Sequence, residues 1–164
     1  MLIRSLKSLL VFAMALMFAV IVVGNVFDFE ANLRFISHVM SMDTLPQDSA
    51  IGGRAIANEV FHHIALWIII FWQAAITLIL LLGGVALWGE RDSGPAFQQV
   101  KGTAMLGLFL GLFLYLVVFL IIGGEWFAMW QSKDWNAQSS SFRFAALFVF
   151  ALVILLFRDD RPGD

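Results

Sequence analysis

The chain has 164 residues, of which 61% are hydrophobic and 13% are charged, and its formal net charge is −2. Ordinary soluble domains carry about 25% charged residues, so this composition excludes that class. The net charge argues against a nucleic-acid partner, which requires a clustered basic surface. The absence of cysteine excludes disulfides, thiolate metal sites and paired-cysteine redox chemistry.

Four long apolar stretches, separated by short segments that hold nearly all the charge, dominate the sequence. They cover residues 9–27, 64–88, 102–124 and 144–157. Roughly 20 apolar helical residues cross hydrocarbon about 30 Å thick, and a continuous apolar run satisfies its backbone hydrogen bonds in lipid as a helix. We therefore predict an all-α polytopic membrane protein, a four-transmembrane-helix bundle that forms a single domain over residues 1–164. Its expected crossings are residues 7–27, 59–88, 101–125 and 139–157.

The first stretch follows Arg4 and Lys7, as the core of a secretory signal would. No small-x-small cleavage site follows it, since residues 22–26 read VVGNV. We therefore expect a retained membrane helix.

The basic residues predict the orientation, because the Lys/Arg bias between the two sides of a membrane sets topology. If the N-terminus is cytoplasmic, that side holds six of them and the opposite side four. We therefore expect both termini in the cytoplasm. The six are Arg4, Lys7, Arg91, Lys101, Arg158 and Arg161, and the four are Arg34, Arg54, Lys133 and Arg143.

The outer segment, residues 28–58, is longer than a connection between helices needs, and such loops are often functional. Apolar residues in its first half recur at intervals of four, three and four, which predicts an amphipathic helix on the outer membrane surface. Ser49 is a candidate cap for the next helix, which we expect to begin near Ile51 and to continue into the second crossing. The apolar residues are Phe29, Leu33, Ile36 and Met40.

Any chemistry is expected on the outer face, where all three histidines fall. Glu59 lies three and four residues before two of them, within reach of both on a helix. The candidate polar cluster comprises His38, Asp43, Arg54, Glu59, His62, His63 and Glu125.

Three explanations compete for this cluster. The first is structural: Asp43, Arg54, Glu59 and Glu125 form ion pairs and hydrogen bonds that hold the outer cap on the bundle. The second is metal or haem ligation by His38 with His62 or His63, helped by Met40 and Met42, a soft donor set that favours copper. The third is a polar pocket for a lipid headgroup, a quinone or a small substrate, in which histidine and carboxylate shuttle protons.

Other residues predict contacts within the bundle and its cap. Gly107 and Gly111 form a G-x-x-x-G pair, which is typical of close helix packing within one bundle or with a partner. We expect Gln73, Thr77 and Asn25 to hydrogen-bond neighbouring helices. Three tryptophans near one loop indicate an interfacial belt and a packed outer cap. They are Trp126, Trp130 and Trp135.

Several motifs resemble a bacterial family known only as predicted small integral membrane proteins with a domain of unknown function. They are HVMSMD at 38–43, RAI at 54–56, GGEWFAMWQS at 123–132, WN at 135–136 and FRF at 142–144. The resemblance covers almost the whole chain. It implies four helices in a bacterial inner membrane and no assigned activity, cofactor or substrate. Relatives often carry an acidic residue around Gln73, so this sequence gives less support to a proton relay at that depth.

The expected function is non-enzymatic: a structural or accessory subunit that packs against a larger membrane complex or a second copy, within the lipid bilayer. Four helices with short loops leave much lipid-facing surface and little room for a catalytic domain. The first alternative is a redox component that binds haem, metal or quinone at the outer cluster. The second is a small transporter, for which the only polar side chains that could line a path through the bundle are Gln73, Thr77 and Asn25.

Overall fold

The computed structural model describes residues 1–46 and 49–159, and all its regular elements are helical. α4 continues directly into a π-helix, η2, and two short 3-10 helices, η1 and η3, lie in the connections. This confirms the predicted all-α class. In chain order the elements are α1 (Leu2–Phe27), α2 (Phe29–Ser41), η1 (Gly52–Arg54), α3 (Glu59–Gly89), α4 (Gly94–Phe113), η2 (Leu114–Trp126), η3 (Met129–Gln131) and α5 (Gln138–Leu156).

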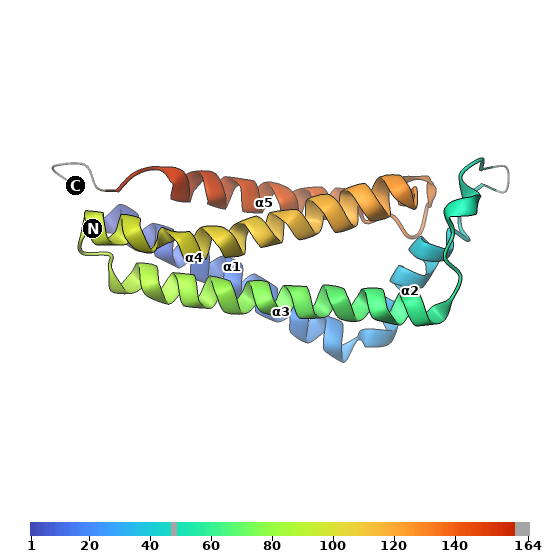
Figure 1. The fold of residues 1–164 in the computed structure, drawn as a ribbon, viewed down its shortest axis with the longest axis horizontal. Coiled ribbons are helices and arrows are strands. Elements are labelled where there is room, and N and C mark those ends of the chain that lie inside the picture. Colours follow the sequence, from blue (N-terminus) through green and yellow to red (C-terminus); the bar gives the residue numbers. More distant parts are fainter. Residues whose placement is uncertain (47–48, 160–164) are drawn as a thin grey trace.

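Four helices, α1, α3, α4 with η2, and α5, are long and apolar enough to cross a membrane. They run side by side, and the start of α1 lies at the same end as the end of α5 (Figure 1). We call this the termini end and the opposite end, which carries α2, the cap end. The four-helix bundle is therefore confirmed, and Arg161, one of the basic residues counted for orientation, lies outside the described residues.

Packing is sequential around the bundle: α1 packs mainly along α3, α3 along α4, and α4 along α5. An aromatic cluster joins three of these helices in the core. The Phe18 ring lies edge-on to Phe148 and to Tyr115, with ring centroids 5.1 Å and 6.1 Å apart. Such edge-to-face pairs add about 0.5–1.5 kcal/mol each beyond the area that they bury.

The helix of the second crossing, α3, itself begins only at Glu59, so the expectation that this helix starts near Ile51 with a Ser49 cap is wrong. Residues 52–54 form a 3-10 turn instead, because two successive glycines disfavour an α-helix. The Asn58 side chain caps α3 by accepting a hydrogen bond from the Val60 N–H at 3.0 Å. In the same way Ser93 caps α4 before Pro95, so that helix begins ahead of the expected residue 101.

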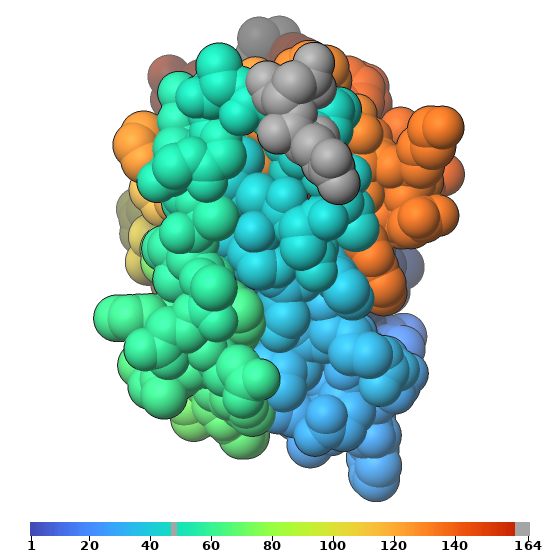
Figure 2. Space-filling view, turned by 90° about the vertical axis from the view of Figure 1, so that its right-hand side faces the viewer, coloured from blue at the N-terminus to red at the C-terminus, as the bar shows by residue number. Residues whose placement is uncertain are grey.

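The predicted amphipathic helix is α2, which closes the cap end. Figure 2 looks onto this end and shows α2 (blue to cyan) between the start of α3 (green) and the segment that leads into α5 (orange). A second, smaller core forms beneath it, in which Val39 and Met42 pack against residues 127–129. Met42 ends α2 in a left-handed conformation with φ 52°. The cap is therefore a packed unit with its own core.

Candidate functional site

A polar cavity of about 490 Å³ lies between α2 and the start of α3 at the cap end. Arg34 and His38 line it from α2, and Glu59, His62 and His63 line it from the first two turns of α3. The cavity thus brings together four members of the cluster expected from the sequence. The other three, Asp43, Arg54 and Glu125, are not part of its lining.

His62 is the most enclosed group in this cavity, with 3% of its surface exposed. Its Nε2 donates a hydrogen bond to the Ile56 carbonyl at 2.7 Å, which ties α3 to the extended segment before it. Its Nδ1 is buried and has no hydrogen-bond partner among the described residues. Because Nε2 carries the proton, Nδ1 is a free acceptor.

His38 is held by two neighbours at the end of α2. Its Nδ1 lies 2.8 Å and 3.0 Å from the two carboxylate oxygens of Asp43. Its ring stacks on Trp135 with centroids 4.4 Å apart and planes 16° apart. His38 therefore connects the end of α2 to the segment before α5.

No ion pair forms among Asp43, Arg54, Glu59 and Glu125 in the described part of the chain, so the expected ion pairs are wrong, but three of these residues do make hydrogen bonds at the cap end. Arg54 instead lies over the Trp126 ring, 4.9 Å from its centroid, and donates to the Trp126 carbonyl at 3.3 Å. Glu125 accepts a hydrogen bond from Gln138 at 3.4 Å. The late start of α3 explains the difference, because Arg54 and Glu59 no longer share one helix.

The candidate soft donors do not converge. Met40 lines an apolar cavity and Met42 is buried in the cap core, whereas His38 and His62 line the polar cavity. Among residues 1–46 and 49–159, no group of three or more His, Asp or Glu side chains is arranged to hold a metal ion.

The aromatic residues of the cap divide into two kinds. Trp126 and Trp130 are more than half exposed, and Trp135 packs against the cap core.

The G-x-x-x-G pair lies in α4, where a Cβ on Gly107 would lie 2.8 Å from Leu80 of α3, and one on Gly111 would collide with Phe148 of α5. The structure thus places both glycines at contacts within this chain.

Polar groups inside the bundle also meet one another. Asn25 of α1 donates to the Gln73 side chain of α3 at 2.7 Å, which confirms the expected bond between helices. Thr77 instead donates to the Gln73 carbonyl of its own helix, so its expected partner was wrong. A hydroxyl in a membrane helix often bonds the carbonyl one turn back, because that acceptor is always within reach.

A buried charge cluster at the termini end was not expected from the sequence. Lys7 of α1 and Lys101 of α4 both contact the Asp159 carboxylate, at 2.7 Å and 2.5 Å. Both lysines also donate to the Phe157 carbonyl, at 2.8 Å and 2.7 Å.

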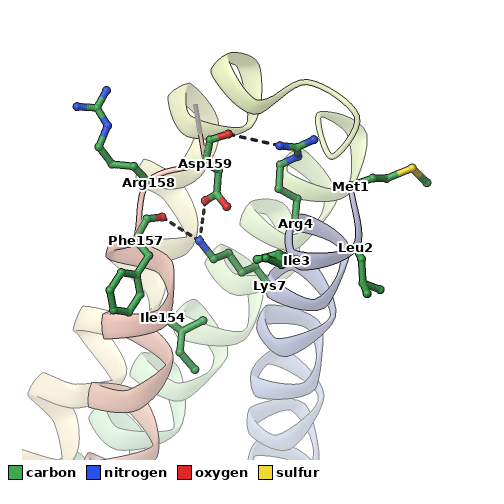
Figure 3. Close-up of a pocket in the computed structure, with 9 residues that line it drawn as sticks. All are labelled: Met1, Leu2, Ile3, Arg4, Lys7, Ile154, Phe157, Arg158 and Asp159. Atoms are coloured by element: carbon green, nitrogen blue, oxygen red, sulfur yellow. Dashed lines mark hydrogen bonds and ion pairs between the residues drawn. The ribbon is translucent and has the colours of Figure 1, made fainter. Parts of the chain in front are cut away.

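Arg4 adds hydrogen bonds at the same end, donating to the carbonyls of Arg91 and Asp159, at 2.7 Å and 3.4 Å. Figure 3 shows Arg4 and Lys7 reaching from α1 to the chain that follows α5.

This cluster links α1, α4 and the end of α5 electrostatically. Burial alone would raise the pKa of the Asp159 carboxyl, but hydrogen bonds and charges from Lys101 and Lys7 outweigh it and hold that pKa below its usual value. Beside the cluster lies a cavity of about 790 Å³ between α1 and α5, whose apolar wall includes Leu2, Ile3 and Ile154.

One sequence signal could have revealed this cluster. Lys101 follows Phe97 by four residues and precedes Leu108 by seven, so it falls on the buried stripe of α4. Its partner Asp159 gives no comparable signal, because a contact between distant segments depends on how the helices pack.

Comparison with known proteins places these features in one family. The family model described as "Predicted small integral membrane protein (DUF2165)" matches residues 3–158. No curated protein and no solved structure matches the chain.

Proposed function

The chain belongs to this family, and we propose that it is a non-enzymatic accessory subunit of a bacterial inner membrane that packs against a larger membrane protein. One observation carries the proposal: apolar side chains stay exposed at positions that we infer to lie beyond the depth that hydrocarbon can cover. They lie at the cap end, on the first turn of α3 and on η3.

The length of α3 supports this placement. Arg91 stacks on Trp88 at the termini end, 4.5 Å from the ring centroid, an arrangement typical of a membrane interface. A rise of 1.5 Å per residue puts Phe61 about 40 Å from Trp88, beyond hydrocarbon about 30 Å thick. The 19 residues of α5 span only about 28 Å, so a tilt that immersed all of α3 would mismatch α5.

The residues beyond that depth are apolar and open. Val60 is 61% exposed, Phe61 53% and Trp130 53%. Exposed apolar patches outside lipid mark interaction surfaces, and aromatic side chains are the usual anchors of protein contacts. A partner that covers these side chains would remove them from water.

We place the cap end on the outer side of the membrane. Five basic residues of the described chain lie at the termini end, against four at the cap end, in the direction of the positive-inside rule. The five are Arg4, Lys7, Arg91, Lys101 and Arg158, and the four are Arg34, Arg54, Lys133 and Arg143.

Site-specific photo-crosslinking at native expression level tests the accessory role. A photoreactive amino acid replaces Phe61 or Trp130. A matched control replaces Phe150 of α5, which is more exposed than either, at 65%, but which we place at hydrocarbon depth. We expect discrete protein adducts from the first two positions, still recovered after pulldown in mild detergent, and none from the control. Recovery of the bare chain from all three positions would contradict the proposal.

A second candidate is ligand binding at the polar cavity, because the His62 Nδ1 is a buried acceptor without a partner. A haem, quinone or headgroup bound there would appear in the absorbance spectrum, metal content or lipid extract of the purified protein. Substitution His62→Gln should then remove it while His63→Gln, whose ring stacks on Phe29, should have a smaller effect. Equal amounts of the bound group in wild type and His62→Gln would contradict binding at this cavity.

A further inference from the structure

Two adjoining cavities lie inside the bundle, below α2. The first, of about 170 Å³, has polar groups of α1, α2, α3, η2 and α5 in its lining beside apolar side chains. The second, of about 270 Å³, is apolar and lies between α2, α3 and η2. Both are lined by Phe35, Ile36, Ile69 and Phe119, so they form one crevice with a polar and an apolar half. Small-molecule sites occupy roughly 300–1,000 Å³ with a few placed polar groups, and this crevice has that composition.

The polar half contains side chains whose hydrogen-bonding capacity is unused. Tyr115 is 5% exposed, and its hydroxyl makes no hydrogen bond within the described part of the chain. Its ring is fixed by stacking on Phe144 and Phe119, with centroids 4.7 Å and 5.3 Å away. Gln73 is 2% exposed and accepts from Asn25, so its own amide N–H groups remain available to the crevice. The Tyr115 hydroxyl and the Gln73 amide N–H groups can therefore donate hydrogen bonds to a molecule in the crevice.

The backbone around the crevice is unusual in the same place. The π-helix η2 supplies Tyr115 and Phe119 to the polar half, and Leu114, Val118 and Ile122 to the apolar half. π-helical turns are rare and occur frequently at functional sites, because the wider turn redirects side chains. Trp72, which lines the apolar half, also has a buried indole N–H without a partner.

The chemistry of the lining restricts the ligand. No charged side chain of the described residues lines either half, so a charged headgroup would be desolvated without compensation. Hydroxyl and amide donors bind carbonyl or hydroxyl oxygens, and the apolar half accepts a hydrocarbon body. We propose that this crevice binds a neutral membrane amphiphile through its carbonyl or hydroxyl oxygens, with Tyr115 and Gln73 as the polar contacts. Quinones and acylglycerols share that chemistry.

Tryptophan fluorescence measures the binding directly, because Trp72 lines the crevice. The purified protein in mild detergent is titrated in two arms, with decylubiquinone and with dioctanoylglycerol. We expect saturable binding of at least one probe, about fivefold weaker in Tyr115→Phe, which removes one hydrogen bond and keeps the stacked ring. Ile36→Trp, which fills both halves from α2, should abolish binding.

Thr77→Val is the matched control, since it removes a hydroxyl from α3 that lines neither half, and it should bind as the wild type does. Unchanged helical circular dichroism and elution volume show that each variant is folded. Binding in the first arm alone identifies a quinone, in the second an acylglycerol, and in both the shared oxygen chemistry. Absence of saturable binding in both arms, or equal binding by wild type, Tyr115→Phe and Ile36→Trp, would overturn the proposal. Neither outcome bears on the accessory role, whose crosslinks form at the far end of α3.

Discussion

Asp159 accepts hydrogen bonds from two lysines that stand on different helices, and all three side chains are almost completely buried. Asp159 is the only carboxylate that pairs with either lysine among the described residues, so the cluster depends on it. Burying charges is costly, so such a cluster stabilises the fold little over an apolar alternative, but the removal of one partner leaves the others uncompensated.

Substitution Asp159→Asn should therefore lower the free energy of unfolding by about 3 kcal/mol, because Lys7 and Lys101 lose their counterion. Denaturant titration in detergent, followed by circular dichroism, measures the change. Asp92→Asn, at an exposed loop position, is the control and should stay within about 0.5 kcal/mol of the wild type. Equal stability of the two variants would show that the cluster is not formed in the membrane protein.

The same carboxylate predicts a pH dependence. Folding lowers the pKa of Asp159 below its ordinary value of 3.8, so the folded state holds the charged form more tightly than the unfolded state does. Its contribution is complete above the ordinary value and disappears as the pH falls through the lowered one. The stability difference between the wild type and Asp159→Asn should thus be constant near neutral pH and shrink below about pH 4. A difference that shrinks between pH 7 and pH 5 would contradict this assignment.

At the scale of elements, α3 and α4 approach each other closely. A Cβ on Gly83 would lie 2.6 Å from the backbone of Ala104, so the two helices touch where no side chain intervenes. Small residues permit such contacts in membranes, where packing replaces the hydrophobic force between helices.

Two matched substitutions test this contact. Gly83→Ala should destabilise the bundle by about 1–3 kcal/mol, because the backbones must separate. Gly102→Ala, in α4 with nothing within 4 Å of the added methyl, should be neutral or stabilise by up to about 1 kcal/mol. Thermal unfolding in detergent measures both, and equal midpoints would rule out the α3–α4 contact as described.

The helices could be predicted from the sequence where a local property, such as apolar length or amphipathic spacing, determines them. Three of the four crossings were predictable from apolar length, and α2 from its amphipathic spacing. The fourth apolar stretch, residues 144–157, is shorter, and it was predicted to cross only with the preceding residues 139–143 included. The start of α3 was not predictable, because Asn58 and Ser49 are both acceptable caps and the choice depends on how residues 52–58 pack under α2.

The candidate site was predictable only in part, for a related reason. Helical spacing placed Glu59, His62 and His63 together, and adding His38 required only that α2 lie beside α3. The Lys7–Asp159 pair could not be predicted, because it joins segments far apart in the chain. The surroundings of the Tyr115 hydroxyl could not be predicted either, because they depend on how distant helices pack. The π-helix η2 has no sequence signal that we recognise.

At the scale of the whole molecule, the bundle is asymmetric along its axis. The termini end is held by buried charges, and the cap end by a small apolar core with open aromatic residues above it. The accessory role that we propose depends on this asymmetry, because a partner must meet the cap end from the outer side of the membrane.

Cysteine accessibility labelling tests that orientation most directly, since the chain contains no cysteine of its own. Single substitutions place one thiol at the cap end, Lys133→Cys, and one at the termini end, Asp92→Cys, both at exposed positions. In intact cells a membrane-impermeant maleimide should label the cap-end thiol at once and the termini-end thiol only after permeabilisation. The reverse pattern, or immediate labelling of both, would contradict the account.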